Sequence, residues 1–377
     1  MKILITGGAG FIGSHLVDAL LKRGHRVVIF DNLEKQVHPE GLPDYLNLKA
    51  TFIRGDVRNR RELKEAMKDV DVIFHLAAAV GVGQSQYQIS KYVDINIRGT
   101  ANLLDILVNE THKVKKLIVA SSMSIYGEGL YLCKKCGKVK PQIRDIEIKS
   151  SDSECKKKDF WEPKCPICQG EIKPVPTSED TPLISNSIYA ITKKEQEEMS
   201  ILIGKTYGIP VVSLRFFNVY GSRQSLSNPY TGVCAIFLSR IKNNKPPVIY
   251  EDGFQTRDFI WVGDIVRACI LCMENEKANF QIFNVGTGKP VSIRKIARTI
   301  AELLNKKIKP EITYRFRKGD IRHCYADIKK IKKLLGFTPQ VTLKEGMSKL
   351  INWAKRTKSV DKFSYAERKL EEKGLVK

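Results

Sequence analysis

The feature that most constrains the fold is the N-terminal segment KILITGGAGFIGSHL, residues 2–16. It joins a short apolar run, a glycine-rich turn and the start of an amphipathic stretch. A strand, a tight turn and a helix in this order form the first part of a β-α-β unit, in which the next strand lies parallel to the first. The segment therefore predicts a chain that begins in a parallel sheet.

The same alternation continues through the first half of the chain. Short runs rich in Ile and Val recur at RVVIF, ATFIRGD, DVIFHLAA and KLIVASS. Between them we expect three helices. The first covers Phe11–Lys22, the second is a charged helix that ends at about residue 70, and the third covers about residues 91–109. Continuous apolar runs are typical of strands that are buried on both faces of a parallel sheet. The pattern predicts an α/β fold with a doubly wound parallel sheet.

The chain of 377 residues is long enough for two domains with sizeable cores. Its alternating pattern stops at Leu130, gives way to a segment rich in Lys, Cys and Pro, and then resumes, which indicates an insertion within one domain. The expected domains are residues 1–130 and 177–218 for the sheet, to which residues 255–286 return, residues 131–176 for the insertion, and residues 219–254 and 287–377 for a smaller second domain.

The glycine turn has the spacing of a dinucleotide site. Gly7, Gly10 and Gly13 give GxxGxxG, and a backbone without Cβ atoms can approach a pyrophosphate closely. The helix that follows, starting at Phe11 and Ile12, offers free N–H groups and the positive end of its dipole. The glycine spacing alone is a weak signal. Its place between a first strand and a first helix favours the dinucleotide site over a simple tight turn.

Acidic residues at the ends of the next two strands indicate which dinucleotide is bound. Asp31 can accept hydrogen bonds from the adenosine ribose hydroxyls, and it would repel a 2′-phosphate. The following Asn32 and Leu33 offer no cation to that phosphate, so the sequence favours NAD over NADP. Asp56 is expected near the adenine, and the alternative role for it is the N-cap of the following helix.

Tyr189 and Lys193 lie four residues apart in a predicted helix, so their side chains share a face. A free tyrosine has a pKa of about 10, and a neighbouring ammonium would lower it by stabilising the phenolate. Lys193 can also bond the nicotinamide ribose. The alternative is a packed tyrosine and a solvated lysine on an ordinary amphipathic helix. Ser122 or Ser124, at the end of the strand KLIVASS, would hold a substrate oxygen while its proton moves to Tyr189.

Eight motifs occur together in the chain: TGGAGFIGSHL, DN, GDV, FHLAA, SSMSIYG, YAITK, RFFNVYG and RDFI. Over about residues 1–355, apart from the insertion, the chain resembles the extended short-chain dehydrogenases/reductases of the nucleotide-sugar epimerase/dehydratase kind. The resemblance implies a Rossmann-type NAD-binding domain, a nucleotide-sugar-binding domain and a homodimer.

The resemblance also implies roles for single residues. Ser122, Tyr189 and Lys193 are the expected catalytic residues. The expected cofactor residues are Gly7, Gly10, Phe11, Ile12, Gly13, Asp31, Asn32, Asp56, Val57, Leu76, Ala77, Ala78, Asn96, Tyr189 and Lys193, with Asn96 near the nicotinamide. The expected substrate residues are Ser122, Ser124, Asn218, Arg257, Arg317 and Asp320, with Asn218 and the two arginines at the diphosphate and Asp320 near the ribose.

The resemblance bears on the type of reaction as well. Dehydratases of this family carry an Asp-Glu pair directly after the catalytic Thr, where this chain has Met123 and Ser124. Because no acid stands there to drive elimination, epimerisation at C4 fits better than dehydration. Tyr189 would take the proton of the C4 hydroxyl while hydride passes to NAD, and hydride would return to the other face of the 4-ketosugar. The alternative enzyme is a net oxidoreductase or a decarboxylase acting on a nucleotide sugar.

Two CxxC pairs lie in the insertion: Cys133 with Cys136, and Cys165 with Cys168. A glycine follows shortly after each pair and allows backbone N–H groups to reach sulfur. Four thiolates form the closed tetrahedral set of a structural zinc site, which leaves no open position for catalysis. We therefore predict a zinc ribbon.

The remaining cysteines are expected to play other parts. Cys155 should stand outside the zinc site, and Cys269 and Cys272 should pack in an apolar helix despite their CxxC spacing. The cysteine pattern favours a reducing, cytoplasmic protein over a disulfide framework. Since the insertion leaves the chain between Ser122 and Tyr189, we expect it at the edge of the sugar pocket, as a lid or an oligomer contact.

The segments YGEGLYLCKKCG, WEPKCPIC, PVPTSEDTPL, QSLSNPYTG and GDIRHCYADI narrow the resemblance. They are similar to the dTDP-L-rhamnose 4-epimerase branch of the family. That relation implies a dTDP-6-deoxyhexose substrate such as dTDP-L-rhamnose.

The net charge of +23 raises the question of an acidic partner. Residues 289–377 carry 25 Lys and Arg against 9 Asp and Glu, and so hold +16 of it. The alternative of a different class is therefore a nucleic-acid-binding protein that uses the zinc ribbon and this basic region. We expect a Lys-rich surface instead, with nucleic acid not a partner, and a last helix that docks by Phe363, Ala366 and Leu370. The N-terminus lacks the features of a secretory signal, and no apolar run is long enough to span a membrane.

Overall fold

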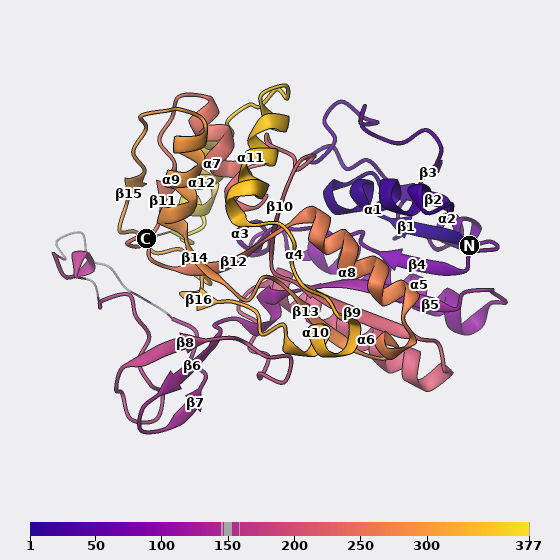
Figure 1. The fold of residues 1–377 in the computed structure, drawn as a ribbon, viewed down its shortest axis with the longest axis horizontal. Coiled ribbons are helices and arrows are strands. Elements are labelled where there is room, and N and C mark those ends of the chain that lie inside the picture. Colours follow the sequence, from indigo (N-terminus) through magenta and orange to yellow (C-terminus); the bar gives the residue numbers. More distant parts are fainter. Residues whose placement is uncertain (145, 147–152, 158, 377) are drawn as a thin grey trace.

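A seven-stranded parallel sheet forms the centre of the computed structural model, which describes residues 1–144, 146, 153–157 and 159–376 (Figure 1). In spatial order its strands are β13 (Ile282–Val285), β9 (Val211–Phe216), β5 (Lys116–Ser122), β4 (Val72–His75), β1 (Lys2–Thr6), β2 (Arg26–Asp31) and β3 (Thr51–Arg54). Every neighbouring pair is parallel. The predicted parallel α/β sheet is confirmed, and its strand order reverses at β1, where ligands bind in folds of this kind.

Helices cover both faces of this sheet. On one face lie α1 (Phe11–Lys22), α8 (Val262–Glu274) and α10 (Lys329–Leu335). On the other lie α2 (Arg60–Ala66), α5 (Gly99–Asn109) and α6 (Ile188–Tyr207). Strands with helices on both faces are buried throughout, which is why β1 and β4 read as continuous apolar runs.

Two helices differ from the expected ones. The helix expected over about residues 91–109 starts earlier, as α4 (Ile89–Tyr92), and passes through a π-helical turn at Val93–Arg98 before α5. The helix α2 ends at Ala66, before the expected end. Its N-cap is Asn59, whose side chain accepts from the Glu62 amide. The alternative role of Asp56 as the N-cap is therefore wrong.

The run PVVSLRFFNVYG forms two strands in different sheets. After β9 the Phe217 amide donates to the Val285 carbonyl at 3.1 Å, and the chain leaves the central sheet. The second sheet contains β10 (Asn218–Tyr220), β12 (Thr256–Trp261), β14 (Pro290–Ser292) and β16 (His323–Cys324). Beside it are α7 (Val233–Lys242), α9 (Ile293–Leu303), α11 (Leu343–Ala354) and the pair β11 (Val248–Ile249) and β15 (Glu311–Ile312), which enclose a separate apolar core.

The insertion forms a three-stranded antiparallel sheet that projects from the rest of the fold (Figure 1). Its strands are β6 (Leu130–Cys133), β7 (Gly137–Val139) and β8 (Ile172–Val175). Its small core contains Tyr131 and Ile172 together with three of the cysteines. Residues 145, 147–152 and 158 of the expected insertion, and residue 377 of the expected second domain, lie outside the described residues.

The C-terminal helix α12 (Phe363–Glu372) docks by one narrow face, as its spacing predicts, with Ala366 and Leu370 buried. Beyond it, the Leu375 carbonyl accepts from the Lys318 amide at 2.9 Å. The described part of the chain also contains a short helix α3 (Val82–Ser85) and 3₁₀ turns at Met123–Tyr126, Ser153–Lys156 and Glu276–Ala278. No helix in these described ranges has the length and apolar character needed to cross a membrane.

Candidate active site

The glycine turn after β1 fits closely against the end of β4. A Cβ atom on Gly7, whose φ is +71°, would stand 2.9 Å from the Ala77 backbone, and one on Gly13 would stand 2.3 Å from the Gly7 carbonyl oxygen. The helix α1 begins here without a side-chain cap and without an acid in its first turn. Its first N–H groups are therefore available to an anion. The turn fits the pyrophosphate of a dinucleotide.

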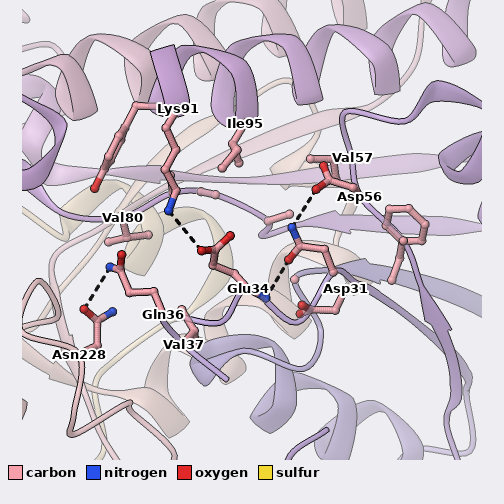
Figure 2. Close-up of a pocket in the computed structure, with 18 of the residues that line it drawn as sticks. Asp31, Glu34, Gln36, Val37, Asp56, Val57, Val80, Lys91, Ile95 and Asn228 are labelled. Atoms are coloured by element: carbon pink, nitrogen blue, oxygen red, sulfur yellow. Dashed lines mark hydrogen bonds and ion pairs between the residues drawn. The ribbon is translucent and has the colours of Figure 1, made fainter. Parts of the chain in front are cut away.

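The residues expected at the adenosine line a pocket beside this turn (Figure 2). The Asp31 carboxylate accepts from the Ala9 amide at 3.0 Å and from the Leu33 amide at 2.9 Å, so it is fixed against the glycine turn. Asn32 donates to Asp56 at 2.9 Å and joins the ends of β2 and β3. These contacts hold Asp31 and Asp56 on the same side of the pocket.

Charged groups around this pocket are already paired. Bonds from Arg58 lower the pKa of Asp56 to about 2, despite partial burial. Lys91 also lines the pocket, although no motif in the sequence marks it as a pocket residue. Its ammonium pairs with Glu34 at 3.3 Å, as Figure 2 shows, so it is not a free cation for a 2′-phosphate. The pocket retains the features expected for NAD.

The other expected cofactor residues lie around the same pocket or directly behind it. Val57, Ala77 and Ala78 line it. Asn96 is fully buried, and its amide is committed to the Ala79 backbone, from which it accepts at 2.8 Å, and to Thr192. Asn96 therefore shapes the loop after β4. Phe11 and Ile12 begin α1, and Ile12 and Leu76 pack against the core.

Tyr189 and Lys193 both lie on α6, which packs beside β5, and the Tyr189 hydroxyl is hydrogen-bonded to Ser122 at the C-terminal end of that strand. The cap of α6 is Ser187, which accepts from the Ala190 amide at 3.1 Å and so fixes the start of the helix that carries Tyr189. The Tyr189 amide donates to Ser85 at 3.0 Å. Burial raises the pKa of Tyr189 to about 12, and a hydrogen bond with the Ser122 hydroxyl opposes that rise.

The position of the Lys193 ammonium differs from the expectation. It donates to Gln196 at 2.8 Å, and burial lowers the pKa of Lys193 to about 7, while Glu197 opposes that fall. The expected lowering of the Tyr189 pKa by Lys193 does not operate in this arrangement. Gln196 was not predicted from the sequence, because nothing in the YxxxK spacing marks a residue three positions beyond the lysine.

Polar side chains of α6 also bond to the elements packed behind this helix. Gln196 donates to Thr100 at 2.7 Å, and Thr100 lies 3.0 Å from the Nε2 atom of His75. Glu197 pairs with Arg215 at 2.6 Å, and both side chains are almost completely buried. Because these contacts join α6 to α5, β4 and β9, they hold α6 in place. Partners so distant in the sequence carry no local signal.

The expected diphosphate residues form a second cluster at the far side of a larger pocket. Asp320 lies between two arginines, bonding Arg257 at 2.9 Å and Arg317 at 2.9 Å. Burial would raise the pKa of Asp320, but the two guanidinium groups lower it to about 2. Asn218 lines the same pocket, and its buried Oδ1 atom has no hydrogen-bond partner among the described residues. The two guanidinium groups suit an anionic ligand, and the open acceptor suits a hydroxyl or amide donor on it.

The helix α12 forms a wall of the larger pocket that was not predicted from the sequence. On the side of Ser122 the pocket is lined by Met123 and Ser124, and Ser124 donates to Ser122 at 2.9 Å. Opposite stands α12, which contributes Phe363, Ala366, Glu367 and Leu370. The helical spacing identified the buried face of α12, but it could not show that this face covers a pocket.

The four insertion cysteines come together. Their sulfur atoms all lie within 4.8 Å of one another, and the Sγ atoms of Cys133 and Cys168 are 3.6 Å apart. Four sulfurs about 2.3 Å from one zinc would be about 3.8 Å apart. The Cys136 and Lys135 amides donate to the Cys133 sulfur and lower its pKa to about 7. The donor set fits a structural metal.

The other cysteines lie elsewhere. Cys155 belongs to a separate cluster with Trp161 and Phe316, outside the four-sulfur cluster. Cys269 and Cys272 are buried in α8 within the main core, as predicted.

Comparisons with known proteins agree with this arrangement. Residues 3–143 match the model of the NAD dependent epimerase/dehydratase family, and residues 168–350 match that of GDP-mannose 4,6 dehydratase. The chain is similar to the dTDP-L-rhamnose 4-epimerase of Burkholderia thailandensis, with 33% identity over 93% of this chain and 94% of that protein. It is also 33% identical to the putative UDP-glucose 4-epimerase of Methanocaldococcus jannaschii, over 94% of this chain and 98% of that protein.

The fold also resembles that of a solved structure. The UDP-glucuronic acid 4-epimerase of Bacillus cereus, in complex with UDP-glucuronic acid and NAD, superposes with a TM-score of 0.76 at 30% identity, covering 94% of this chain and 99% of that chain. With family models matching on both sides of the insertion, this chain belongs to the NAD-dependent epimerase/dehydratase family.

Proposed function

We propose that the protein epimerises C4 of a nucleotide-activated sugar, with a dTDP-6-deoxyhexose such as dTDP-L-rhamnose as substrate. The observation that carries this proposal is the hydrogen bond between Tyr189 and Ser122 at the end of β5, with Lys193 one turn further along α6. Met123 and Ser124 stand where an eliminating enzyme of the family has its acids. The described residues directly after Ser122 therefore offer no acid for dehydration, which favours proton transfer at a single carbon.

In this proposal the larger pocket binds the nucleotide sugar from end to end. Arg257 and Arg317 hold the diphosphate, Asp320 stands near the ribose, and Asn218 donates its amide to a phosphate oxygen. A phosphate that enters would take up guanidinium bonds that Asp320 now holds. Charge-assisted bonds of this kind orient a diphosphate strongly.

The surroundings of the reacting sugar support a 6-deoxy substrate. Beside Ser122 the pocket is lined by Met123, Val82 and Gly83, and Leu370 of α12 lies within 3.6 Å of a Cβ placed on Gly83. A methyl group at C5 is favourable against such a lining, whereas a carboxylate would be desolvated there without a cation beside it. This favours a deoxyhexose over a uronic acid.

The chemistry follows from the residues at the reacting carbon. Bound NAD supplies a hydride acceptor that becomes a donor in the return step. Ser122 bonds the C4 oxygen, and Tyr189 takes its proton as the hydride leaves and gives it back in the second half. Lys193, released from Gln196 toward the nicotinamide ribose, places a positive charge near Tyr189 and stabilises its phenolate. The overall reaction consumes no cofactor.

The decisive experiment incubates the purified protein alone with a panel of dTDP- and UDP-sugars and follows the epimer ratio by NMR. We expect an equilibrium mixture of C4 epimers from a dTDP-6-deoxyhexose, with no added nucleotide. No change in any sugar would contradict the proposal. A strict requirement for added NADPH, or release of CO₂ from a uronic acid, would indicate the oxidoreductase or the decarboxylase instead.

We also propose that Cys133, Cys136, Cys165 and Cys168 hold one structural zinc ion in the insertion domain, residues 131–176. Their mutual distances support this assignment. Elemental analysis of the purified protein should give about one zinc per chain, and the variant Cys168→Ser should lose it. Zinc retained by that variant at the same level would argue against the site.

The proposed assembly is a homodimer. Its support is an exposed apolar surface on α6, where Leu202 is 64% exposed and Ile191 is 42% exposed. Apolar patches on a surface helix are typical of subunit interfaces. Sedimentation should give twice the chain mass, and Leu202→Glu should give the monomer.

A further inference from the structure

A cluster of buried charges joins the insertion to the second domain. We call it the buried ion cluster, and its members are Glu128, Arg144, Glu162, Glu251, Asp252 and Arg322. Arg144 and Glu162 belong to the insertion, between its two CxxC pairs. Glu251, Asp252 and Arg322 belong to the second domain, and Glu128 lies just before the insertion.

Arg144 of the insertion bonds one acid just before the insertion, Glu128, and one acid of the second domain, Glu251. Its Nε atom donates to Glu128 at 3.1 Å and its Nη2 atom donates to Glu251 at 2.8 Å. The guanidinium also lies 5.3 Å from the centre of the Phe316 ring. Arg144 is 9% exposed, so these bonds replace water.

Arg322 is the centre of the cluster and is fully buried. Within the second domain it bonds Glu251 at 2.9 Å and Asp252 at 2.7 Å, and it also bonds Glu162 of the insertion at 2.7 Å. Glu162 also bonds the ring of His323 at 3.0 Å. Removing one partner from a buried set leaves an uncompensated charge, so the set behaves as a unit.

The second-domain members of the cluster are chain neighbours of residues that line the larger pocket. Tyr250, which precedes Glu251, and Asp320 and Ile321, which precede Arg322, all line it. Glu251 has a φ of +55°, a backbone conformation that non-glycine residues rarely adopt unless contacts hold it there. The conformations of both pocket segments are therefore tied to the cluster.

The insertion also touches the turn that follows the catalytic Ser122. The Lys140 ammonium donates to the backbone carbonyl of Glu128 at 2.9 Å and also bonds the carbonyl of Tyr126. Insertion side chains thus contact three separate segments around the pocket: the turn after Ser122, the loop at Tyr250, and the loop that carries Arg317 and Asp320.

We propose that the insertion is a positioning element of the substrate site, and that Arg144 and Glu162 hold the pocket segments in the geometry that binds the nucleotide diphosphate. The inference rests on the proposed function for the identity of the ligand. It explains why a metal is useful in this part of the chain: the insertion core is small, and a zinc-stapled platform keeps Arg144 and Glu162 in place. No insertion residue needs to contact the substrate.

The test variant is Glu162→Gln, because Glu162 is partly exposed and Arg322 keeps two other acids when it is changed. The matched control is Glu154→Gln, which removes an insertion acid whose pair with Lys157 is 2.7 Å long and fully at the surface. Isothermal titration with dTDP, and with UDP, measures binding without any turnover. NAD affinity and the melting temperature are measured on the same samples.

We expect Glu162→Gln to weaken dTDP binding about tenfold, and to raise the substrate KM by a similar factor with little change in kcat. NAD affinity should be unchanged, and Glu154→Gln should match the wild type in every measurement. A second variant, Arg144→Lys, keeps the charge but cannot make both bonds, and it should weaken dTDP binding in the same way.

The outcomes separate the two proposals. Wild-type dTDP affinity in both Glu162→Gln and Arg144→Lys would overturn the positioning role and leave the proposed function intact. Equal losses of dTDP and NAD affinity would show a general loss of structure and would also overturn it. If the wild type binds neither dTDP nor UDP, the proposed function itself fails.

Discussion

At the scale of single residues, Tyr189 stands in an environment that does not by itself favour its ionised form. Burial raises the pKa of Tyr189 to about 12, and the ammonium of Lys193 is turned toward Gln196. A group with that pKa is protonated at neutral pH and cannot accept a proton. In the proposed function, Lys193 bonded to the nicotinamide ribose would place an ammonium near the phenol, and the nicotinamide ring would add a second positive charge. Both charges favour the phenolate, so we expect bound NAD to lower the pKa of Tyr189.

Replacing Tyr189 with phenylalanine removes only the phenolic oxygen. We expect Tyr189→Phe to lower the rate of C4 epimerisation about 10²- to 10⁴-fold, the range of a lost general acid/base. NAD content should stay at the wild-type level, because the glycine turn and Asp31 are untouched. The control is Tyr207→Phe on the same helix, whose side chain is 53% exposed. Equal activity of Tyr189→Phe and the wild type would exclude this assignment.

Some site residues could be predicted from the sequence because their chemistry is local. Gly7 is favoured by the positive φ of the turn and Gly13 by its close contact with Gly7, and the spacing of Tyr189 and Lys193 lies within one helix. The roles of Gln196 and Glu162, and the place of Leu370 at the pocket, could not be predicted. Each acts through partners that only the folded chain brings near, such as Thr100 for Gln196 and Arg322 for Glu162.

At the scale of elements, the position of α12 shows the same limit of prediction from the sequence. The spacing of Ala366 and Leu370 predicts a helix that buries one narrow face, and the structure has that helix. Its place is set by tertiary contacts: Arg315 pairs with Glu367 at 3.4 Å, and Tyr250 donates to Glu367 at 3.2 Å. Periodicity determines which face is buried but not what lies beneath it.

The position of α12 over the pocket leads to a prediction about substrate binding. We expect Leu370→Ala to raise the substrate KM about tenfold with little change in kcat, because it opens the wall opposite Gly83 and removes apolar contacts made in both the ground and transition states. Steady-state kinetics checks this. The control is Arg368→Ala, whose side chain is 67% exposed on the same helix. A fall in kcat with an unchanged KM would contradict a binding role.

At the scale of the whole molecule, part of the positive charge of the basic region 289–377 lies inside the fold. Arg315, Arg317 and Arg322 are paired with acids, two of them beside or within the larger pocket. The lysines of this region lie on helices that pack on different cores and in the loops between those helices. These three arginines are therefore not free to contact nucleic-acid phosphates, and the net charge of +16 of the region rests on its other cations.

The buried ion cluster also makes stability depend on pH. Burial would raise the pKa of Glu162, but His323 and Arg322 outweigh it and lower the value from 4.5 to about 2. Between these two values the unfolded chain binds more protons than the native chain, so stability falls as the pH falls. The contribution of Glu162 is fully present above about pH 4.5 and is lost as the pH falls through about 2.

Comparison of Glu162→Gln with the wild type isolates this contribution. By urea unfolding at pH 6 we expect the variant to be less stable by on the order of 2 kcal/mol, since a glutamine cannot supply the ionised partner. The difference should shrink as the pH is lowered toward 2, where the wild-type carboxyl is itself protonated. Glu154→Gln, at the surface of the same insertion, should differ little at either pH. A constant difference across this range would mean that Glu162 stabilises the protein by packing and not by its charge.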